Sequence, residues 1–161
     1  MNVMIGITGH TKGLGQHLFN QFQKNYHVKG FSRSNGFDIK NPNNRKKIYE
    51  QIKDCNIFIN LVHNYYHQTD VLFELFQEWE NQEKLIINVS SQVVDSDDWG
   101  MDRYDYIEYK NQKQNMENMS RTLQNKNVKP SVVNYRISEI NFQADFTNLN
   151  NIINEFKLHK K

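Results

Sequence analysis

Eight residues near the N-terminus have the types and spacing of a phosphate-binding turn. They read Thr8-Gly9-His10-Thr11-Lys12-Gly13-Leu14-Gly15, directly after an apolar run. Glycine permits a tight turn from strand to helix and lets the backbone approach a pyrophosphate closely. The helix that follows would present unpaired N–H groups and the positive end of its dipole to that phosphate. The turn is therefore predicted to bind a dinucleotide through these residues: Gly9, Thr11, Lys12, Gly13, Leu14 and Gly15.

The next apolar run ends in Ser32 and Arg33, without an acidic residue at its tip. In dinucleotide-binding folds an Asp or Glu at this place bonds a ribose 2′-hydroxyl, whereas an Arg accommodates a 2′-phosphate. Lys12 adds a second cation nearby, so the pattern favours NADP(H) as the cofactor. The alternative, that both are ordinary solvated surface cations, stays open at this level.

Short β-rich runs alternate with amphipathic stretches along the chain. About six runs are predicted to be strands: 2–8, 27–32, 37–39, 55–61, 84–89 and 131–137. Helices are predicted over 13–24, around 48–52, over 71–79 and 104–124, and finally over 146–156. Such alternation indicates βαβ units and a mainly parallel sheet. The predicted fold is a Rossmann-type three-layer α/β/α sandwich that forms a single domain over residues 1–161.

Composition limits the classes of partner. With 161 residues, 37% hydrophobic content and a net charge of +2, the chain is expected to be one globular domain. Lys and Arg number 20 against 18 Asp and Glu, so there is no broad basic field and nucleic acid is not an expected partner. No apolar run approaches the roughly 20 residues of a membrane helix. No signal peptide is recognised and there is one cysteine, so a cytoplasmic location is expected.

The turn TGHTKGLG resembles the TGxxxGxG motif of the short-chain dehydrogenase/reductase family, and the likeness extends over about residues 2–137. The segment NLVH, which begins at Asn60, stands where that family has Asn-Asn-Ala-Gly. The run INVSS is similar to the family's strand that ends in the catalytic serine, here Ser91. The resemblance implies an oxidoreductase that transfers hydride between NADP(H) and a carbonyl or alcohol substrate. It also implies cofactor contacts at Asp38 and Asn60. Ser32, at the end of the second run, is expected to contact the cofactor too, and no metal site is expected because His63 and His67 lack a third ligand.

The family's acid–base pair is Tyr-x-x-x-Lys, whose spacing places both side chains on one helix face. The lysine would lower the tyrosine pKa, so that the hydroxyl exchanges a proton with the substrate oxygen. Two pairs lie in the predicted helix 104–124, Tyr106/Lys110 and Tyr109/Lys113. The second pair continues along one face through positions 116, 120 and 123, so Tyr109 and Lys113 are the predicted catalytic residues, with Lys113 also holding the ribose.

Loop length keeps the first pair open, because Tyr106 lies 15 positions after Ser91 and Tyr109 lies 18. The acidic stretch 95–98 is expected to absorb the difference as a surface loop. His63 and His67, four residues apart, are interpreted as polar or cofactor-adjacent side chains rather than as a zinc pair.

After its last predicted strand the chain lacks the family's Pro-Gly turn, and residues 140–161 suffice for one helix. The substrate-binding lobe is therefore expected to be reduced or absent, as in a minimal family member. An open site weakens water exclusion and substrate positioning. This keeps a second function open, a non-catalytic NADP(H)-binding sensor or assembly module. The retained serine and the phased Tyr/Lys pair favour the enzyme.

Three bulky aromatics suggest an interface. In the family, the helices that flank the fifth strand commonly pair across a two-fold axis. Phe73, Phe76 and Trp79 provide more apolar surface than a small sheet requires, and such patches mark interfaces. A homodimer through helices 69–79 and 104–124 is therefore predicted. The alternative is that helix 146–156 folds back and covers the aromatics.

Overall fold

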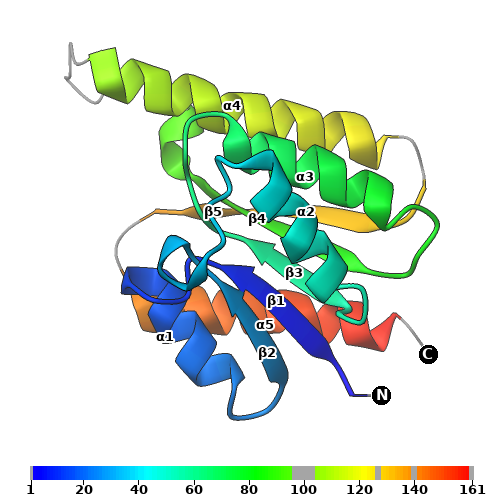
Figure 1. The fold of residues 1–161 in the computed structure, drawn as a ribbon. Coiled ribbons are helices and arrows are strands. Elements are labelled where there is room, and N and C mark those ends of the chain that lie inside the picture. Colours follow the sequence, from blue (N-terminus) through cyan, green and yellow to red (C-terminus); the bar gives the residue numbers. More distant parts are fainter. Residues whose placement is uncertain (1, 96–103, 126–127, 139–140, 160–161) are drawn as a thin grey trace.

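The computed structural model describes residues 2–95, 104–125, 128–138 and 141–159, whose five strands form one parallel sheet (Figure 1). The elements are, in chain order, β1 (Met4–Thr8), α1 (Gly13–Phe22), β2 (His27–Phe31), η1 (Arg33–Asn35), α2 (Pro42–Gln51), β3 (Ile57–Asn60), α3 (His67–Glu78), β4 (Leu85–Ser91), η2 (Gln92–Asp95), α4 (Tyr104–Gln124), β5 (Ser131–Ile137) and α5 (Phe142–Leu158). The strand order is β2-β1-β3-β4-β5, and every neighbouring pair is parallel. The predicted Rossmann-type α/β sandwich is confirmed.

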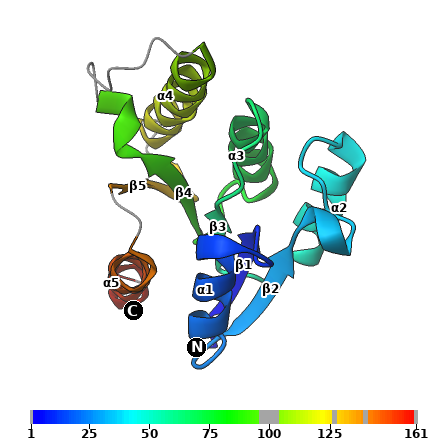
Figure 2. The same cartoon turned by 90° about the vertical axis from the view of Figure 1, so that its left-hand side faces the viewer.

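Helices cover both faces of this sheet. α1 and α5 lie on one face, and α2, α3 and α4 lie on the other (Figure 2). One apolar cluster includes Leu18 of α1 and Leu149 of α5, and the other includes Ile48, Leu72 and Met116 of the opposite helices. Because β1, β3 and β4 are buried from both sides, they read as nearly continuous apolar runs. None of the described helices is long and apolar enough to cross a membrane.

The predicted strand over residues 37–39 does not form, and this segment stays outside the sheet. The ring of Phe37 packs edge-on against Phe31, with 5.0 Å between ring centroids, and Ile39 is buried. Arg45 Nη1 donates to the carbonyl oxygen of Ile39 at 2.8 Å. A side chain therefore satisfies this buried carbonyl, and the segment needs no strand as a partner.

The order of the strands creates a switch point between β1 and β3. The chain runs outward from β1 to β2 and then returns past β1 to form β3. In open α/β sheets, ligands bind outside the carboxyl ends of the strands at such a point. The predicted site residues that follow β1, β2, β3 and β4 are thus brought to one edge of the sheet.

The three aromatics of the predicted dimer interface have different environments. Trp79 is 2% exposed and Phe76 is 6% exposed, whereas Phe73 is 41% exposed. The first two belong to the core cluster beneath α2, α3 and α4, and α5 lies on the opposite face of the sheet (Figure 2). Phe76 and Trp79 are therefore buried by other residues of this chain, and α5 does not contribute to their burial. The homodimer stays a prediction, and it now depends on Phe73 and the outer surfaces of α3 and α4.

Candidate functional site

A cleft of about 980 Å³ runs along the carboxyl ends of the strands. We call the part after β1 and β2 the cation end, and the part after β3 and at the start of α4 the tyrosine end. The cation end is lined by Gly9, Thr11, Lys12, Ser32, Arg33, Ser34, Phe37, Asp38 and Ile39. The tyrosine end is lined by Val62, His63, Asn64, Tyr65, Glu108, Tyr109 and Gln112. The cleft thus joins the predicted cofactor turn to the predicted catalytic tyrosine.

The glycine turn has the geometry that the motif predicts. Gly9 and Gly13 have positive φ angles of 80° and 53°. A Cβ at Gly15 would lie 1.8 Å from the carbonyl oxygen of Gly9, so α1 packs directly on the turn. A Cβ at Gly13 would meet no atom within 4 Å. Gly13 therefore leaves open space at the start of α1, where the backbone N–H groups are exposed to a ligand.

His10 fastens the turn to β2, a role that the sequence reasoning did not assign. Its ring packs on Phe19, with 4.9 Å between centroids, and the adjacent Gly9 backbone N–H donates to the Phe31 carbonyl oxygen at 2.7 Å. A Cβ at Gly30 would lie 2.3 Å from His10 Cγ, so this strand position requires glycine. Burial lowers the pKa of His10, and the backbone of Phe31 acts in the opposite direction. In the sequence, a glycine inside an apolar run, Gly30, is the signal that another group packs closely against this strand.

The electrostatics of the cation end suit an anion. The N-terminus of α1 has no side-chain cap and no acidic residue in its first turn. Lys12 and Arg33 are exposed, and neither forms an ion pair within the described part of the chain. Asn35 holds the turn that carries Arg33, because its Oδ1 accepts from the Ser32 backbone N–H at 2.8 Å. These cations are therefore free to meet a phosphate group.

Of the two candidate catalytic tyrosines, Tyr109 lines the cleft and Tyr106 does not. Ser91, at the end of β4, is a neighbour of Tyr109 that affects its pKa. Burial raises the pKa of Tyr109, while the polar side chain of Ser91 opposes this effect. The direction is opposite to the lowering that the resemblance implies, because burial is the largest cause. Tyr109 is accordingly a protonated hydroxyl at neutral pH.

Lys113 lies beneath Tyr109 and outside the cleft lining. It is 3% exposed, and its Nζ lies 5.7 Å from the centroid of the Tyr109 ring. Nζ donates to Gln68 Oε1 at 2.7 Å and to the carbonyl oxygen of Val89 at 3.0 Å. Burial lowers the pKa of Lys113 to about 8, and the charge of Glu117 acts in the opposite direction. The sequence reasoning overlooked Gln68, because nothing in the spacing of the chain pairs positions 68 and 113.

Asn60 also lies outside the cleft lining, although the resemblance places it at the cofactor. Its Nδ2 donates to the backbone oxygen of Gln68 and to Asn88 Oδ1, both at 3.0 Å. Gln68 Nε2 in turn donates to the backbone oxygen of Asn60 at 2.8 Å. In this structure Asn60 therefore ties β3 to α3 and β4, and it supports the site from below.

His63 stands beside Tyr109 in the tyrosine end. Their ring centroids are 4.6 Å apart, with the rings edge to face at 63°. Burial first, and then the charge of Lys113, lower the pKa of His63 to about 4, while the side chain of Gln112 acts in the opposite direction. His67 instead lies on α3, where its Nδ1 is 3.0 Å from Asp70 Oδ2. Of this pair, only His63 lines the cleft.

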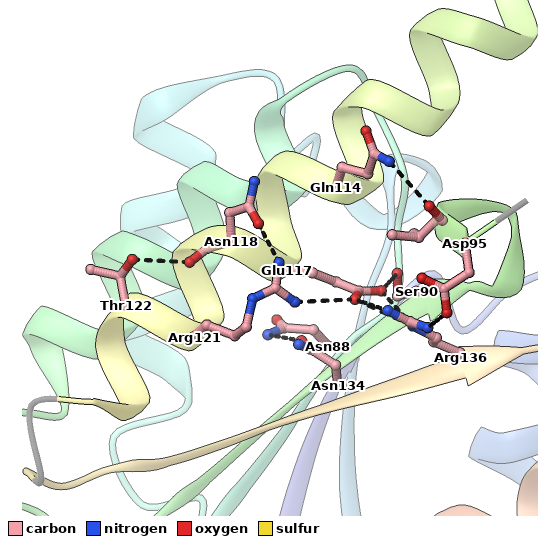
Figure 3. Close-up of polar contacts among 11 residues, drawn as sticks. Asn88, Ser90, Asp95, Gln114, Glu117, Asn118, Arg121, Thr122, Asn134 and Arg136 are labelled. Carbon is pink, nitrogen blue, oxygen red and sulfur yellow. Dashed lines mark hydrogen bonds and ion pairs between the residues drawn. The ribbon is translucent and has the colours of Figure 1, made fainter. Parts of the chain in front are cut away.

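A second polar cluster anchors α4 to the sheet (Figure 3). Glu117 is 1% exposed, and its Oε2 accepts a bond from Ser90 Oγ at 2.6 Å. Its Oε1 lies 2.7 Å from Arg136 Nη2 on β5, and Arg136 also pairs with Asp95. Because a carboxylate buried here is paired and hydrogen-bonded, it can hold the helix in one register. Of the acidic stretch 95–98, only Asp95 lies within the described residues.

Scans of the sequence against protein-family models and against curated proteins find no match. Solved structures do match. A short chain dehydrogenase from Burkholderia cenocepacia in complex with NADP has a TM-score of 0.66 and 17% identity, over 85% of this chain and 70% of that one. Gre2 from Candida albicans in complex with NADPH has a TM-score of 0.65 and 17% identity, over 84% and 57% of the two chains.

A further match is the 3-alpha-hydroxysteroid dehydrogenase of a Pseudomonas species in complex with NADH. It has a TM-score of 0.61 and 14% identity, over 84% of this chain and 78% of that one. Identities of this size establish the architecture alone. The chain therefore has the fold of the short-chain dehydrogenases.

Proposed function

We propose that the chain is an NADP(H)-dependent oxidoreductase that interconverts a carbonyl and an alcohol, with residues 1–161 acting as one dinucleotide-binding domain. The observation that carries this proposal is the cleft, which connects a glycine turn with two free cations to a tyrosine that has Ser91 as a polar neighbour. Structures of the same fold in complex with NADP, NADPH or NADH support a nicotinamide dinucleotide as the ligand.

The cation end fits such a cofactor. The open space at Gly13 and the uncapped start of α1 would receive the pyrophosphate. Lys12 and Arg33 would bind a 2′-phosphate, which favours NADP(H) over NAD(H). Asp38 lies on the same wall, where the resemblance implies an adenine contact. When bound, NADPH supplies the hydride.

The residues of the tyrosine end would transfer a proton to the substrate. Tyr109 carries a proton at neutral pH and lines the cleft, so it can donate to the oxygen of a bound carbonyl group. The Ser91 hydroxyl would orient that oxygen. The Lys113 ammonium, beneath the Tyr109 ring, would stabilise the negative charge left on the phenol oxygen.

The direct test follows NADPH absorbance while the protein is mixed with a panel of small aldehydes and ketones. We expect turnover with at least one carbonyl compound. Ser91→Ala should lower that turnover by roughly 100-fold and leave NADPH binding within a factor of two. No turnover across the panel at saturating NADPH would contradict the enzyme proposal.

One observation favours a second candidate, a non-catalytic NADP(H)-binding module. Lys113 Nζ is bonded inward to Gln68 and Val89 and does not reach the cleft, where a ribose would lie. A protein that binds NADPH tightly through the cation end and reduces nothing would fit this arrangement. The two candidates share the predictions for the cation end and differ only at the tyrosine end.

A further inference from the structure

One wall of the cation end is formed by Phe37, Asp38 and Ile39, and we call it the 37–39 wall. Two of its side chains are apolar, and the half-buried carboxylate of Asp38 lies between them in the sequence. Asp38 Oδ1 accepts from the backbone N–H of Lys40 at 3.0 Å, whereas Oδ2 has no hydrogen-bond partner among the described residues. Such a wall is complementary to a planar base with an exocyclic amino group, which would pack on the apolar side chains and donate to the carboxylate.

The 37–39 wall lies outside the sheet, so other groups must hold its backbone. At its start, the backbone N–H of Phe37 donates to the carbonyl oxygen of Ser32 at 2.9 Å. At its end, Arg45 Nη1 of α2 donates to the carbonyl oxygen of Ile39 at 2.8 Å. Arg45 is 6% exposed and Ile39 is 2% exposed, so water is poorly placed to replace this bond. The Arg45 bond therefore fixes the end of the wall next to Asp38.

Arg45 is itself held by α3. Its Nε lies 3.0 Å from Glu74 Oε2, and its Nη2 lies 2.9 Å from Glu74 Oε1. The Tyr49 hydroxyl also donates to Glu74 Oε2, at 2.6 Å. The planar guanidinium can pair with this carboxylate and donate to Ile39 at the same time, which a lysine ammonium is not shaped to do. The position of the 37–39 wall is thus tied to α3 through one side chain.

We propose that Arg45 is a positioning residue for recognition of the cofactor base. By holding the Ile39 carbonyl group, it keeps the Asp38 carboxylate where the amino group of an adenine would lie. The role is indirect, because Arg45 does not line the cleft. Hypoxanthine has an oxygen in place of that amino group, and this oxygen would face the carboxylate as a second acceptor. The inference rests on the proposed NADP(H) binding and adds to it the choice of base.

The experiment compares NADPH with deamino-NADPH, which carries hypoxanthine, by fluorescence titration. The wild type should favour NADPH by roughly tenfold, as one hydrogen bond to a charged group would give. Glu74→Gln loses the ion pair but keeps the bond from Arg45 to Ile39, so the preference should remain. Adding Arg45→Met to that variant removes the bond, and the preference should fall below about twofold.

A ratio of two affinities for one protein does not depend on the fraction that is folded, so a loss of stability alone would not change it. A preference that persists in the double variant would overturn the role of Arg45. A preference lost in Glu74→Gln alone would overturn it as well, because the bond to Ile39 is still present there.

A second readout needs no cofactor. The backbone N–H groups of Lys40 and Asn41 both donate to Asp38, and NMR can follow their hydrogen exchange. Exchange should be roughly tenfold faster in the double variant than in the single one, with Tyr26 on the far side of the sheet as an unchanged reference. Equal rates in the two variants, or equal acceleration at Tyr26, would overturn the proposal.

Arg45→Lys replaces the double variant if that protein does not fold. It keeps a charge beside the Glu74 carboxylate, the stronger acceptor, and should release Ile39 with the same effects. If the wild type binds no NADPH, the proposed function fails, and the exchange rates alone decide whether Arg45 holds the 37–39 wall.

Discussion

The two ends of the cleft are built in different ways. The cation end is made by short turns after β1 and β2, and its charged groups, Lys12 and Arg33, are exposed. The tyrosine end is formed by the segment after β3 and by α4. Its residues His63, Asn64, Glu108 and Tyr109 are half-buried and Gln112 is buried, and the ring contact of His63 with Tyr109 joins segments that are distant in the sequence. The first end is suited to bind an anion with little rearrangement. The second resembles a preorganised reaction site, whose properties depend on burial more than on charge.

The largest expected effect concerns the backbone of the cation end. Gly15→Ala places a Cβ 1.8 Å from the Gly9 carbonyl oxygen, a contact that only a backbone shift can relieve. We expect the free energy of unfolding to fall by at least about 3 kcal/mol, measured by urea denaturation. Gly36→Ala is the control, because its Cβ would meet no atom. Its positive φ should cost only about 1–2 kcal/mol, and equal losses in both variants would contradict the packing role of Gly15.

At the tyrosine end the largest expected effect is a loss of turnover when one hydroxyl group is removed. Tyr109→Phe removes the hydroxyl of the cleft-lining tyrosine, so turnover should fall by at least roughly 100-fold. NADPH affinity should change less than twofold, because the fold and the cation end are intact. Tyr106→Phe, one helical turn away, should have a much smaller effect in the same assay. The reverse pattern would move the catalytic role to the Tyr106/Lys110 pair.

The buried imidazole should appear in the pH dependence of stability. His63 has a pKa of about 4 in the folded chain and about 6.5 when unfolded. Between these values the unfolded state binds more protons, so the free energy of unfolding falls as the pH drops from 6.5 to 4. After allowance for partial solvent screening the effect is about 2 kcal/mol. In His63→Phe this slope should be smaller, and an unchanged slope between pH 4 and 6.5 would contradict the burial of His63.

The smallest effect belongs to an exposed charge. Arg33→Ala should weaken NADPH binding by roughly tenfold, at the low end for a charge-assisted hydrogen bond because the site is solvated. NADH binding should be almost unaffected, since it lacks the 2′-phosphate. Both affinities are measured by fluorescence titration, and Lys24→Ala, which removes a cation just beyond the C-terminus of α1, serves as the control. Equal weakening of NADPH and NADH would show that Arg33 does not recognise the 2′-phosphate.

The same contrast explains what could be predicted from the sequence. The parallel sheet and the glycine turn follow from local patterns, because apolar runs and glycine spacing constrain the nearby backbone directly. The sequence predicts a strand over residues 37–39, but the bond from Arg45 to Ile39 replaces strand pairing. Similarly, the sequence places Phe76 and Trp79 in an interface, whereas both pack in the core cluster with residues of α2 and α4.

The tyrosine end was predictable only in part. Helical phase selects Tyr109 over Tyr106, and the structure places Tyr109 in the cleft lining. The partners of Lys113 and the burial of His63 arise from contacts between segments that are distant in sequence. Burial also reverses the expected direction of the Tyr109 pKa shift. Such effects depend on the three-dimensional surroundings of a group, which one-dimensional spacing does not contain.

The central claim is that a dinucleotide binds with its phosphates at the start of α1, and a titration of Gly13→Asp tests it most directly. Gly13 has a φ of 53°, which aspartate tolerates better than most residues, and its side chain would enter open space. The fold should persist by circular dichroism, while the added charge repels the pyrophosphate. We predict that the wild type binds one NADPH per chain and that Gly13→Asp binds at least roughly 100-fold more weakly, with Gly36→Asp close to the wild type. Unchanged NADPH affinity in Gly13→Asp, or no saturable binding by the wild type, would contradict the account.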